Sequence, residues 1–150
     1  MSLKEYNKKR NFEKTPEPKK SELKKSSKKI FVVHEHHASH LHWDLRLEMN
    51  RVLKSWAVPK EPPTAKEIKR LAIQVEDHPL SYANFEGEIP EGNYGAGKVK
   101  IWDKGTYDLI SKDDKKIEIE FYGKKLKGKY VLLKTHYGSK PEKSWLFFKI

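Results

Sequence analysis

The side chains best suited to chemistry lie close together, in the stretch HEHHASHLHWDLRLE at residues 34–48. This stretch holds five of the seven histidines of the chain, followed by Asp44 and Arg46. Imidazole and carboxylate groups are suitable ligands for Mn²⁺, Zn²⁺ or Fe²⁺, and a guanidinium is well shaped to bind the oxygens of a phosphate. The pattern indicates a metal site beside an oxyanion site, although a histidine-rich stretch can also be an ordinary surface loop.

A β-strand is expected to position these groups. From residue 41 to residue 49 every odd position is apolar and every even position is polar or charged. This period of two is typical of a strand and cannot come from a helix. His42, Asp44 and Arg46 would then lie on one face, about 6.6 to 7 Å apart at each step.

A third metal ligand is still needed, and His36 or His37, just before the Ala-Ser turn, could fold back to supply it. Other histidine motifs fit poorly. HLHWDL imitates the H-x-H-x-D-H motif of metallo-β-lactamase-like hydrolases, but Leu45 stands in place of the last histidine, which argues against a binuclear site. No G-x-x-x-x-G-K-[ST] motif occurs, and the glycines of GNYGAG at residues 92–97 are expected to permit tight β-turns.

Further cations are expected around a phosphate, because its charge spreads over several oxygens. The candidates are Lys54, Lys60 and Arg70, although each taken alone could be an ordinary surface charge. Arg70 has the strongest pattern, because it alternates in phase with Glu76 and His78 on a predicted strand. We therefore expect Arg70 and His78 on one face.

The rest of the chain is predicted to form short strands separated by turns. Strand-like runs begin at Ile30 and recur at residues 70–78, 99–101, 117–121, 129–137 and 144–150. Turn-forming residues lie between them, including Asp-Lys-Gly at 103–105, and only TAKEIKRL at 64–71 has a helical pattern. Seven to nine short strands with one short helix favour an antiparallel barrel or a sandwich.

The net charge of +11 is concentrated at the N-terminus. Residues 1–30 hold eleven Lys or Arg against four Glu, and the remaining residues are nearly balanced. A basic arm over residues 1–29, followed by one domain over residues 30–150, indicates a polyanionic partner. Nucleic acid is favoured over a membrane because no apolar stripe accompanies the lysines. The alternative is a solvated tail that only aids solubility.

The chain has no cysteine, which excludes disulfides, thiolate metal sites and cysteine nucleophiles. No apolar run approaches the roughly 20 residues of a membrane span, and no signal-peptide core is present at the N-terminus. We therefore expect a soluble, intracellular protein.

Two long stretches carry a family resemblance. FVVHEHHASHLHWDLRLEMNRVLKSWAVPKEPP at 31–63 and RLAIQVEDHPLSYANFEGEIPEGNYGAGKVKIWDKGTY at 70–107 closely resemble the 3′-phosphoesterase domain of bacterial DNA ligase D and its stand-alone archaeal and bacterial versions. The resemblance implies a β-barrel and a manganese-dependent enzyme that heals DNA 3′ ends. Such enzymes remove a 3′-terminal ribonucleoside by phosphodiester cleavage and then the remaining 3′-phosphate, leaving a 3′-OH. With the strand pattern, the resemblance predicts a closed antiparallel β-barrel of about eight strands.

The resemblance also implies roles for particular residues. It implies metal binding by His36, His42 and Asp44, and catalytic roles for His42, Asp44, Arg46, His78 and Tyr82. It implies phosphate contacts by Arg46, Lys60, Arg70, His78 and Tyr82, and supporting roles for Arg10, Glu17 and Glu76. The metal would be Mn²⁺, with Zn²⁺ or Co²⁺ also acceptable to these ligands. Asn11 stands where the family arm carries an aspartate.

The substrate implied by the resemblance is a DNA primer-template whose 3′ end carries a ribonucleotide or a phosphate. No polymerase or ligase sequence is present, so we expect cooperation with a separate ATP-dependent ligase, a polymerase or a Ku-like protein in a prokaryotic cytoplasm. Two alternatives remain. One is a non-catalytic DNA-end-binding module, and the other is a metal-dependent hydrolase of a small phosphorylated metabolite, whose activity should be indifferent to salt.

Overall fold

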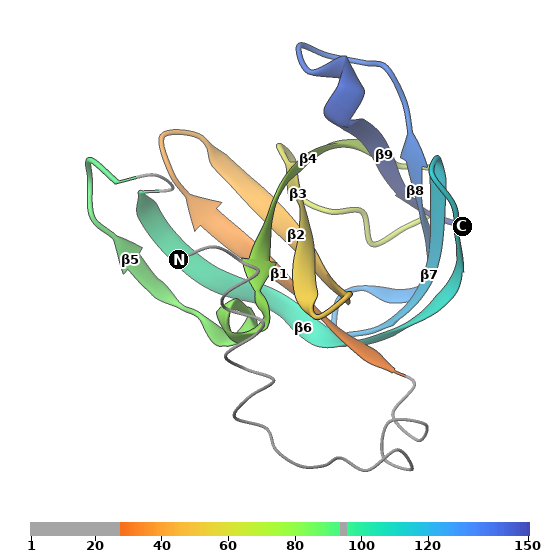
Figure 1. The fold of residues 1–150 in the computed structure, drawn as a ribbon, viewed down its shortest axis with the longest axis horizontal. Coiled ribbons are helices and arrows are strands. Elements are labelled where there is room, and N and C mark those ends of the chain that lie inside the picture. The colour runs from red at the N-terminus through yellow and green to blue at the C-terminus, as the bar shows by residue number, and fades with distance from the viewer. Residues whose placement is uncertain (1–27, 94–95) are drawn as a thin grey trace.

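The computed structural model describes residues 28–93 and 96–150, and this part of the chain consists almost entirely of β-strands (Figure 1). It contains nine strands and two short 3₁₀ helices. In chain order they are β1 (Lys29–His37), β2 (Leu41–Met49), β3 (Val52–Val58), β4 (Lys69–Pro79), η1 (Leu80–Asn84), β5 (Gly87–Ile89), β6 (Gly97–Lys112), β7 (Lys116–Tyr122), β8 (Lys127–Lys134), η2 (Pro141–Lys143) and β9 (Ser144–Lys149).

The strands form one antiparallel sheet that closes into a barrel. Neighbouring strands follow the order β1, β2, β3, β4, β9, β8, β7 and β6, and β6 pairs with β1 to complete a ring of eight. The short β5 pairs with the N-terminal end of β6, outside this ring. Figure 1 looks through the ring, with β5 to its left. The predicted closed antiparallel barrel of about eight strands is confirmed.

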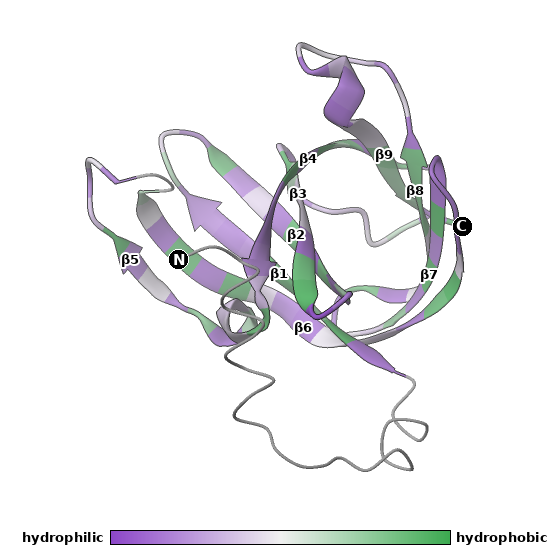
Figure 2. Ribbon diagram, viewed as in Figure 1, coloured by the Kyte–Doolittle hydropathy of each residue, from purple (hydrophilic) through white to green (hydrophobic). Residues whose placement is uncertain are grey.

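The barrel interior is packed with the apolar residues of the alternating strands, and alternating hydrophobic and hydrophilic bands are visible along β6 in Figure 2. Leu45 and Leu47 of β2 point inward and are fully buried. Aromatic rings fill the interior: the Phe121 ring centroid lies 4.7 Å from that of Phe31 and 5.1 Å from that of Tyr130. Each large apolar side chain buried in this way stabilises the fold by about 1.5 to 3 kcal/mol. The closed ring therefore gives the strands a firm common scaffold.

A second, smaller apolar cluster lies on the outer face of the sheet. Its buried members are Val32 of β1, Leu53 of β3 and Ala83 of η1. The helix η1 therefore packs against the outside of the barrel. Because successive side chains of a strand alternate between faces, the even-numbered residues of β1 and β2 point to this same outer side. The even-numbered polar residues of the histidine-rich stretch thus lie outside the barrel, on the face that also carries η1.

The prediction of a helix over residues 64–71 is wrong. Residues 64–68 form bends and an isolated bridge, and the following residues already belong to β4. Lys66 makes its bridge with Lys149 at the end of β9, and Glu67 has a left-handed φ of 69°. Intrinsic helix propensities differ by at most about 0.7 kcal/mol for ordinary residues, so tertiary pairing with the neighbouring strand outweighs them.

The Asp-Lys-Gly segment at 103–105 is not a turn either, because it lies inside the long strand β6. The carboxylate of Asp103 is buried and accepts hydrogen bonds from the backbone N–H groups of residues 124–126. A Cβ at Gly105 would collide with the backbone carbonyl oxygen of Tyr122. The aspartate and the glycine therefore serve the packing of β6 against the end of β7, rather than a change of direction.

Residues 1–27, with Arg10, Asn11 and Glu17, lie outside the described residues, so the division into a basic arm and a domain stays a prediction. Neither the short helices nor any other helix in the described part of the chain has the length and apolar character of a membrane span.

We expect Tyr130→Phe to lower the free energy of unfolding by about 1 to 3 kcal/mol. Tyr130 is fully buried, and its hydroxyl donates a 2.7 Å hydrogen bond to the carbonyl of Pro63, which the substitution leaves unpaired. Denaturant titration measures the change. Tyr137→Phe is the control, because Tyr137 is 61% exposed; it should stay within about 0.5 kcal/mol of the unmodified protein. Equal stabilities of the two variants would contradict this account.

Candidate functional site

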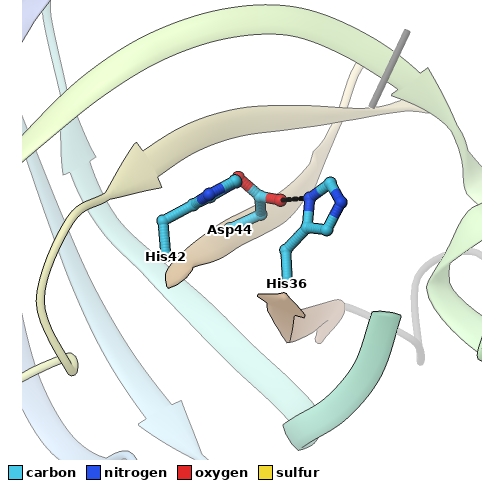
Figure 3. A group of neighbouring side chains, drawn as sticks. All are labelled: His36, His42 and Asp44. Carbon is cyan, nitrogen blue, oxygen red and sulfur yellow. Dashed lines mark ion pairs between the residues drawn. The ribbon is translucent and has the colours of Figure 1, made fainter. Parts of the chain in front are cut away.

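Three side chains that could hold a metal ion meet where β1 and β2 pair. The antiparallel register places His36 opposite His42, and Asp44 follows two residues later on the same face. One ligand atom from each lies within 4.8 Å of the others. Figure 3 shows the three side chains pointing toward one another, His36 from β1 and the other two from β2. The ring of His37, the other candidate for the third ligand, instead pairs with Glu35 at 2.6 Å.

Backbone carbonyls orient both imidazole rings. Nε2 of His36 donates to the carbonyl of Ala96 at 3.2 Å, and Nδ1 of His42 donates to the carbonyl of His40 at 3.3 Å. The other nitrogen of each ring is thereby turned toward Asp44, with 3.6 Å from Nδ1 of His36 to Oδ2 and 3.2 Å from Nε2 of His42 to Oδ1. Histidines that bind metals usually donate their second ring nitrogen in this way. The donor set therefore fits a divalent cation.

The electrostatics keep the carboxylate charged. Burial acts to raise the pKa of Asp44, but hydrogen bonds from His36 and His42 and the charge of Arg46 outweigh it and hold that pKa well below its usual value. The hydrogen bond to Asp44 in turn raises the pKa of His42 above 6.5, against the effect of burial. A cation at this site would replace the protons shared within the cluster.

Arg46 lies beside the triad, and its side chain is buried, with 4% of the residue exposed. Nη2 donates to Oδ2 of Asp44 at 3.3 Å, and Nη1 donates to Oγ of Ser55 at 2.9 Å. Nε donates to Nδ1 of His34 at 3.0 Å, and Nη1 also lies 3.1 Å from Nδ1 of His78. A buried charge is tolerated only when it is paired and hydrogen-bonded, and here the partners come from four strands.

His78 reaches this site because β4 contains a bulge. The register of β3 and β4 pairs Ser55 with Val75 but Leu53 with His78, so β4 has one more residue than β3 across this interval. The extra residue reverses the alternation of faces. His78 therefore points to the outer side together with Val75.

The hydrogen bonds of His78 restrict its tautomer. Nδ1 lies 3.1 Å from Nη1 of Arg46 and also 3.1 Å from the carbonyl oxygen of Glu76. A guanidinium can only donate and a carbonyl can only accept, so Nδ1 serves one partner at a time. Burial and the charge of Arg46 lower the pKa of His78, which favours the neutral ring. When Nδ1 accepts from Arg46, that neutral ring carries its proton on Nε2.

Tyr82 of η1 covers the same group of side chains. Its ring centroid lies 4.8 Å from that of His78 and 5.0 Å from Cζ of Arg46. The ring is stacked on Phe85 with 5.0 Å between centroids. Burial raises the pKa of Tyr82, although Arg46 opposes this, so the phenol is a hydrogen-bonding group rather than an anion at neutral pH.

These groups line one cavity of about 430 Å³. Its lining includes His36, His42, Asp44, Arg46, His78 and Tyr82, with Ala57, Val75 and Ile89 among its apolar members. A volume of this size fits a small ligand or the end of a larger one. The structure thus brings together six of the residues that the sequence and the resemblance singled out.

The expectation that Arg70 and His78 share a face is wrong. Upstream of the bulge the even-numbered residues of β4 face the barrel interior, where Ala72 belongs to the core. Nε of Arg70 donates to the carbonyl of Glu61 at 2.8 Å, in the loop that also carries the exposed Lys60. Neither Arg70 nor Lys60 is among the described residues that line the cavity.

Two polar residues of this site were not predicted from the sequence. His34 is fully buried and binds Arg46, and the fully buried Ser55 accepts from the same guanidinium. For His34 a signal existed, since it alternates in phase with His36 on β1. Ser55 lies on β3 directly opposite Arg46, a pairing that only the register of β2 and β3 shows.

Comparisons with known proteins identify the family of the chain. Residues 34–134 match the family described as DNA Ligase D 3′-phosphoesterase domain. The chain is 45% identical over 98% of its length to the multifunctional non-homologous end joining protein LigD of Pseudomonas aeruginosa. The chain is also 45% identical over 89% of its length to the LigD of Mycobacterium tuberculosis, and 42% identical over 94% of its length to the LigD of Mycolicibacterium smegmatis. The chain spans only 18 to 19% of the length of these relatives.

We expect the metal-free protein to bind one Mn²⁺ or Zn²⁺, and His42→Ala to weaken that binding by more than about 10-fold. Isothermal titration calorimetry measures both. Because protons compete with the metal for His42, the affinity should fall with falling pH. Since Asp44 raises the pKa of His42, that fall should begin above pH 6.5.

The matched control for metal binding is His37→Ala, because the ring of His37 pairs with Glu35 and not with Asp44. This variant should bind the metal as the unmodified protein does. An equal loss of affinity in both variants, or unchanged affinity in His42→Ala, would exclude the triad as the metal site.

Proposed function

Because the chain belongs to the DNA ligase D 3′-phosphoesterase domain family, we propose that it is a phosphoesterase that heals DNA 3′ ends. It removes a 3′-terminal ribonucleoside by phosphodiester cleavage and the remaining 3′-phosphate by monoester cleavage. The product is a 3′-OH that a polymerase or a ligase can use. The activity belongs to non-homologous end joining, the process for which these relatives are named.

One observation supports this proposal above all. A two-histidine, one-carboxylate cluster and a buried guanidinium open into the same cavity, next to His78 and Tyr82. Phosphoryl transfer needs cationic groups around the phosphate and proton donors at its oxygens, because negative charge spreads over those oxygens in the transition state. A plain nucleic-acid-binding surface does not need a buried metal-ligand triad.

We propose that His36, His42 and Asp44 hold the divalent cation, with Mn²⁺ preferred and Zn²⁺ or Co²⁺ acceptable. When bound, such an ion supplies Lewis-acid stabilisation of the negative charge on a phosphate oxygen. The protein contributes the orientation of the ligands through the carbonyls of His40 and Ala96.

Arg46, His78 and Tyr82 act on the phosphate from the other side. The guanidinium of Arg46 supplies a fixed positive charge, with Nη2 3.3 Å from Oδ2 of Asp44. His78 in the tautomer that accepts from Arg46 offers Nε2–H to a phosphate or leaving oxygen. Because its lowered pKa favours the neutral ring, His78 acts as a hydrogen-bond donor to the transition state rather than as a strong acid. The Tyr82 hydroxyl orients the phosphate.

Lys60 and Arg70 would act from outside the cavity. Arg70 of β4 donates to the carbonyl of Glu61, so it is held beside the loop that carries Lys60. We propose that they contact the DNA backbone or the outer phosphate oxygens. Glu76 would support His78 only in the other tautomer, in which Nδ1 donates to its carbonyl at 3.1 Å. The basic arm, with Arg10 and Glu17, would contact the primer-template strand.

We propose that the protein acts together with an ATP-dependent ligase activity, a polymerase activity or a Ku-like end-binding protein. The ligase and the polymerase follow from the chemistry of the product, since a 3′-OH is useful only to an enzyme that extends or joins it. The Ku-like protein is proposed from the family resemblance alone.

The direct test is incubation with a primer-template that ends in a 3′-phosphate or in a single 3′-ribonucleotide, with and without Mn²⁺. We expect metal-dependent formation of a 3′-OH end. We also expect a loss of at least about 100-fold in rate for His42→Ala, which removes a metal ligand, and for His78→Ala, which removes a donor to the reacting phosphate. His37→Ala should keep the unmodified rate.

Product without added metal after chelation, or product from His42→Ala at the unmodified rate, would overturn this mechanism. Tight binding of the primer-template without any cleavage would instead favour the non-catalytic DNA-end-binding module.

A salt titration separates DNA from a small metabolite as the substrate. If lysines of the arm bind the DNA backbone, KM for the primer-template should rise by more than about 10-fold between 50 and 200 mM salt, because counterion release drives that binding. KM for a mononucleoside 3′-phosphate should change far less. Equal salt dependence of the two substrates would argue for the metabolite hydrolase.

A further inference from the structure

His34 occupies a fully buried position of β1 between two fixed partners. Its Nδ1 lies 3.0 Å from Nε of Arg46, and its Nε2 lies 3.1 Å from the carbonyl oxygen of Phe85. Arg46 can only donate and the carbonyl can only accept, so the ring must accept at Nδ1 and donate at Nε2. The neutral tautomer with its proton on Nε2 satisfies both bonds.

The bond to Nε sets the plane of the Arg46 guanidinium. This group is planar and rigid, so fixing Nε also fixes the directions of Nη1 and Nη2. Those two atoms reach Ser55, His78 and Asp44. The side chain of His34 therefore restricts the orientation of Arg46, the one arginine among the described residues that line the cavity, while His34 is not itself among those lining residues.

The same ring also connects Arg46 to the segment that carries Tyr82. The carbonyl of Phe85 belongs to the chain between η1 and β5, and the Phe85 ring is stacked on Tyr82. The His34 ring contacts Tyr82 edge to face, with 5.3 Å between centroids. Two groups that line the cavity, Arg46 and Tyr82, are thus held by a single buried side chain.

We propose that His34 is a positioning residue of the phosphate site. Its side chain fixes Arg46 and the segment that carries Tyr82 relative to each other and does not touch the substrate. This inference rests on the proposed function for its kinetic consequences, but the hydrogen bond itself can be tested without any activity. A glutamine at this position offers one acceptor and one donor and can replace both bonds. A phenylalanine fills a similar volume and can replace neither.

Kinetics of the full chain on a primer with a 3′-phosphate provide the first test. We expect His34→Phe to lower kcat by about 100-fold with KM changed less than about threefold. A misplaced catalytic group loses mainly its stabilisation of the transition state, while substrate binding is little affected. His34→Gln should stay within about threefold of the unmodified kcat. His37→Phe, at an exposed histidine of the same stretch, is the matched control and should have no effect. A kcat for His34→Phe equal to that of the unmodified protein, or no rescue by glutamine, would overturn the proposal.

A double-mutant cycle tests whether His34 acts through Arg46. Lysine at position 46 keeps the positive charge but has no Nε–H for His34 to hold. In the Arg46→Lys background, His34→Phe should therefore lower kcat by less than about threefold. A loss of the same size in both backgrounds would show that His34 acts on general stability instead.

Proton–nitrogen NMR of the arginine Nε–H groups gives the readout that needs no substrate. The Arg46 Nε–H signal should exchange slowly with water in the unmodified protein and in His34→Gln, and should exchange rapidly or vanish in His34→Phe. Circular dichroism checks that this last variant is folded. If it is unfolded, loss of slow exchange in folded His34→Ala carries the test. Slow exchange that persists without His34 would overturn the proposal. Absence of cleavage by the unmodified protein, with the NMR result as expected, would refute the proposed function and leave the positioning role intact.

Discussion

The site depends on the burial of opposite charges side by side. Arg46 is 4% exposed and Asp44 is 6% exposed, so each would cost several kcal/mol if left unpaired. Besides Asp44, the charge of Arg46 is stabilised by neutral groups whose directions the strands fix, namely His34 on β1, Ser55 on β3 and His78 on β4. Four neighbouring strands must therefore keep their register for the charges to stay buried. This requirement explains why the polar groups converge on one small volume.

The closed barrel makes that register possible without taking part in the chemistry. Its interior is filled with aliphatic and aromatic side chains, and the site lies on the opposite, outer face of the same strands. The alternation of a strand lets β2 serve both sides, with Leu45 and Leu47 inside and Asp44 and Arg46 outside. A second apolar cluster under η1 then holds Tyr82 against the site. Stability and function are thus assigned to different faces of one sheet.

The sequence was sufficient where a rule is local and failed where the structure depends on pairing. The period of two in β2 predicted which side chains share a face, and the register confirms His42, Asp44 and Arg46 on the outer side. The same rule failed for Arg70 and His78, because one extra residue in β4 reverses the alternation between them. A bulge is defined by the partner strand, so alternation within one strand cannot reveal it.

The role of His34 was hidden for a related reason. Its ring nitrogens are satisfied by Arg46 and by the carbonyl of Phe85, a residue 51 positions away in the chain. Burial and the charge of Arg46 lower the pKa of His34 to about 3, so the ring is neutral and serves as an acceptor for a cation. Residue type alone suggests a metal ligand or a surface group, and only the surroundings decide otherwise.

The most direct test of the whole account is a crystal structure of the protein with Mn²⁺ and inorganic phosphate, with anomalous diffraction recorded at the manganese edge. The account predicts one manganese peak within bonding distance of His36, His42 and Asp44, and a phosphate that contacts the metal together with Arg46 or His78. A manganese peak elsewhere in the chain, or a phosphate bound away from Arg46 and His78, would contradict it.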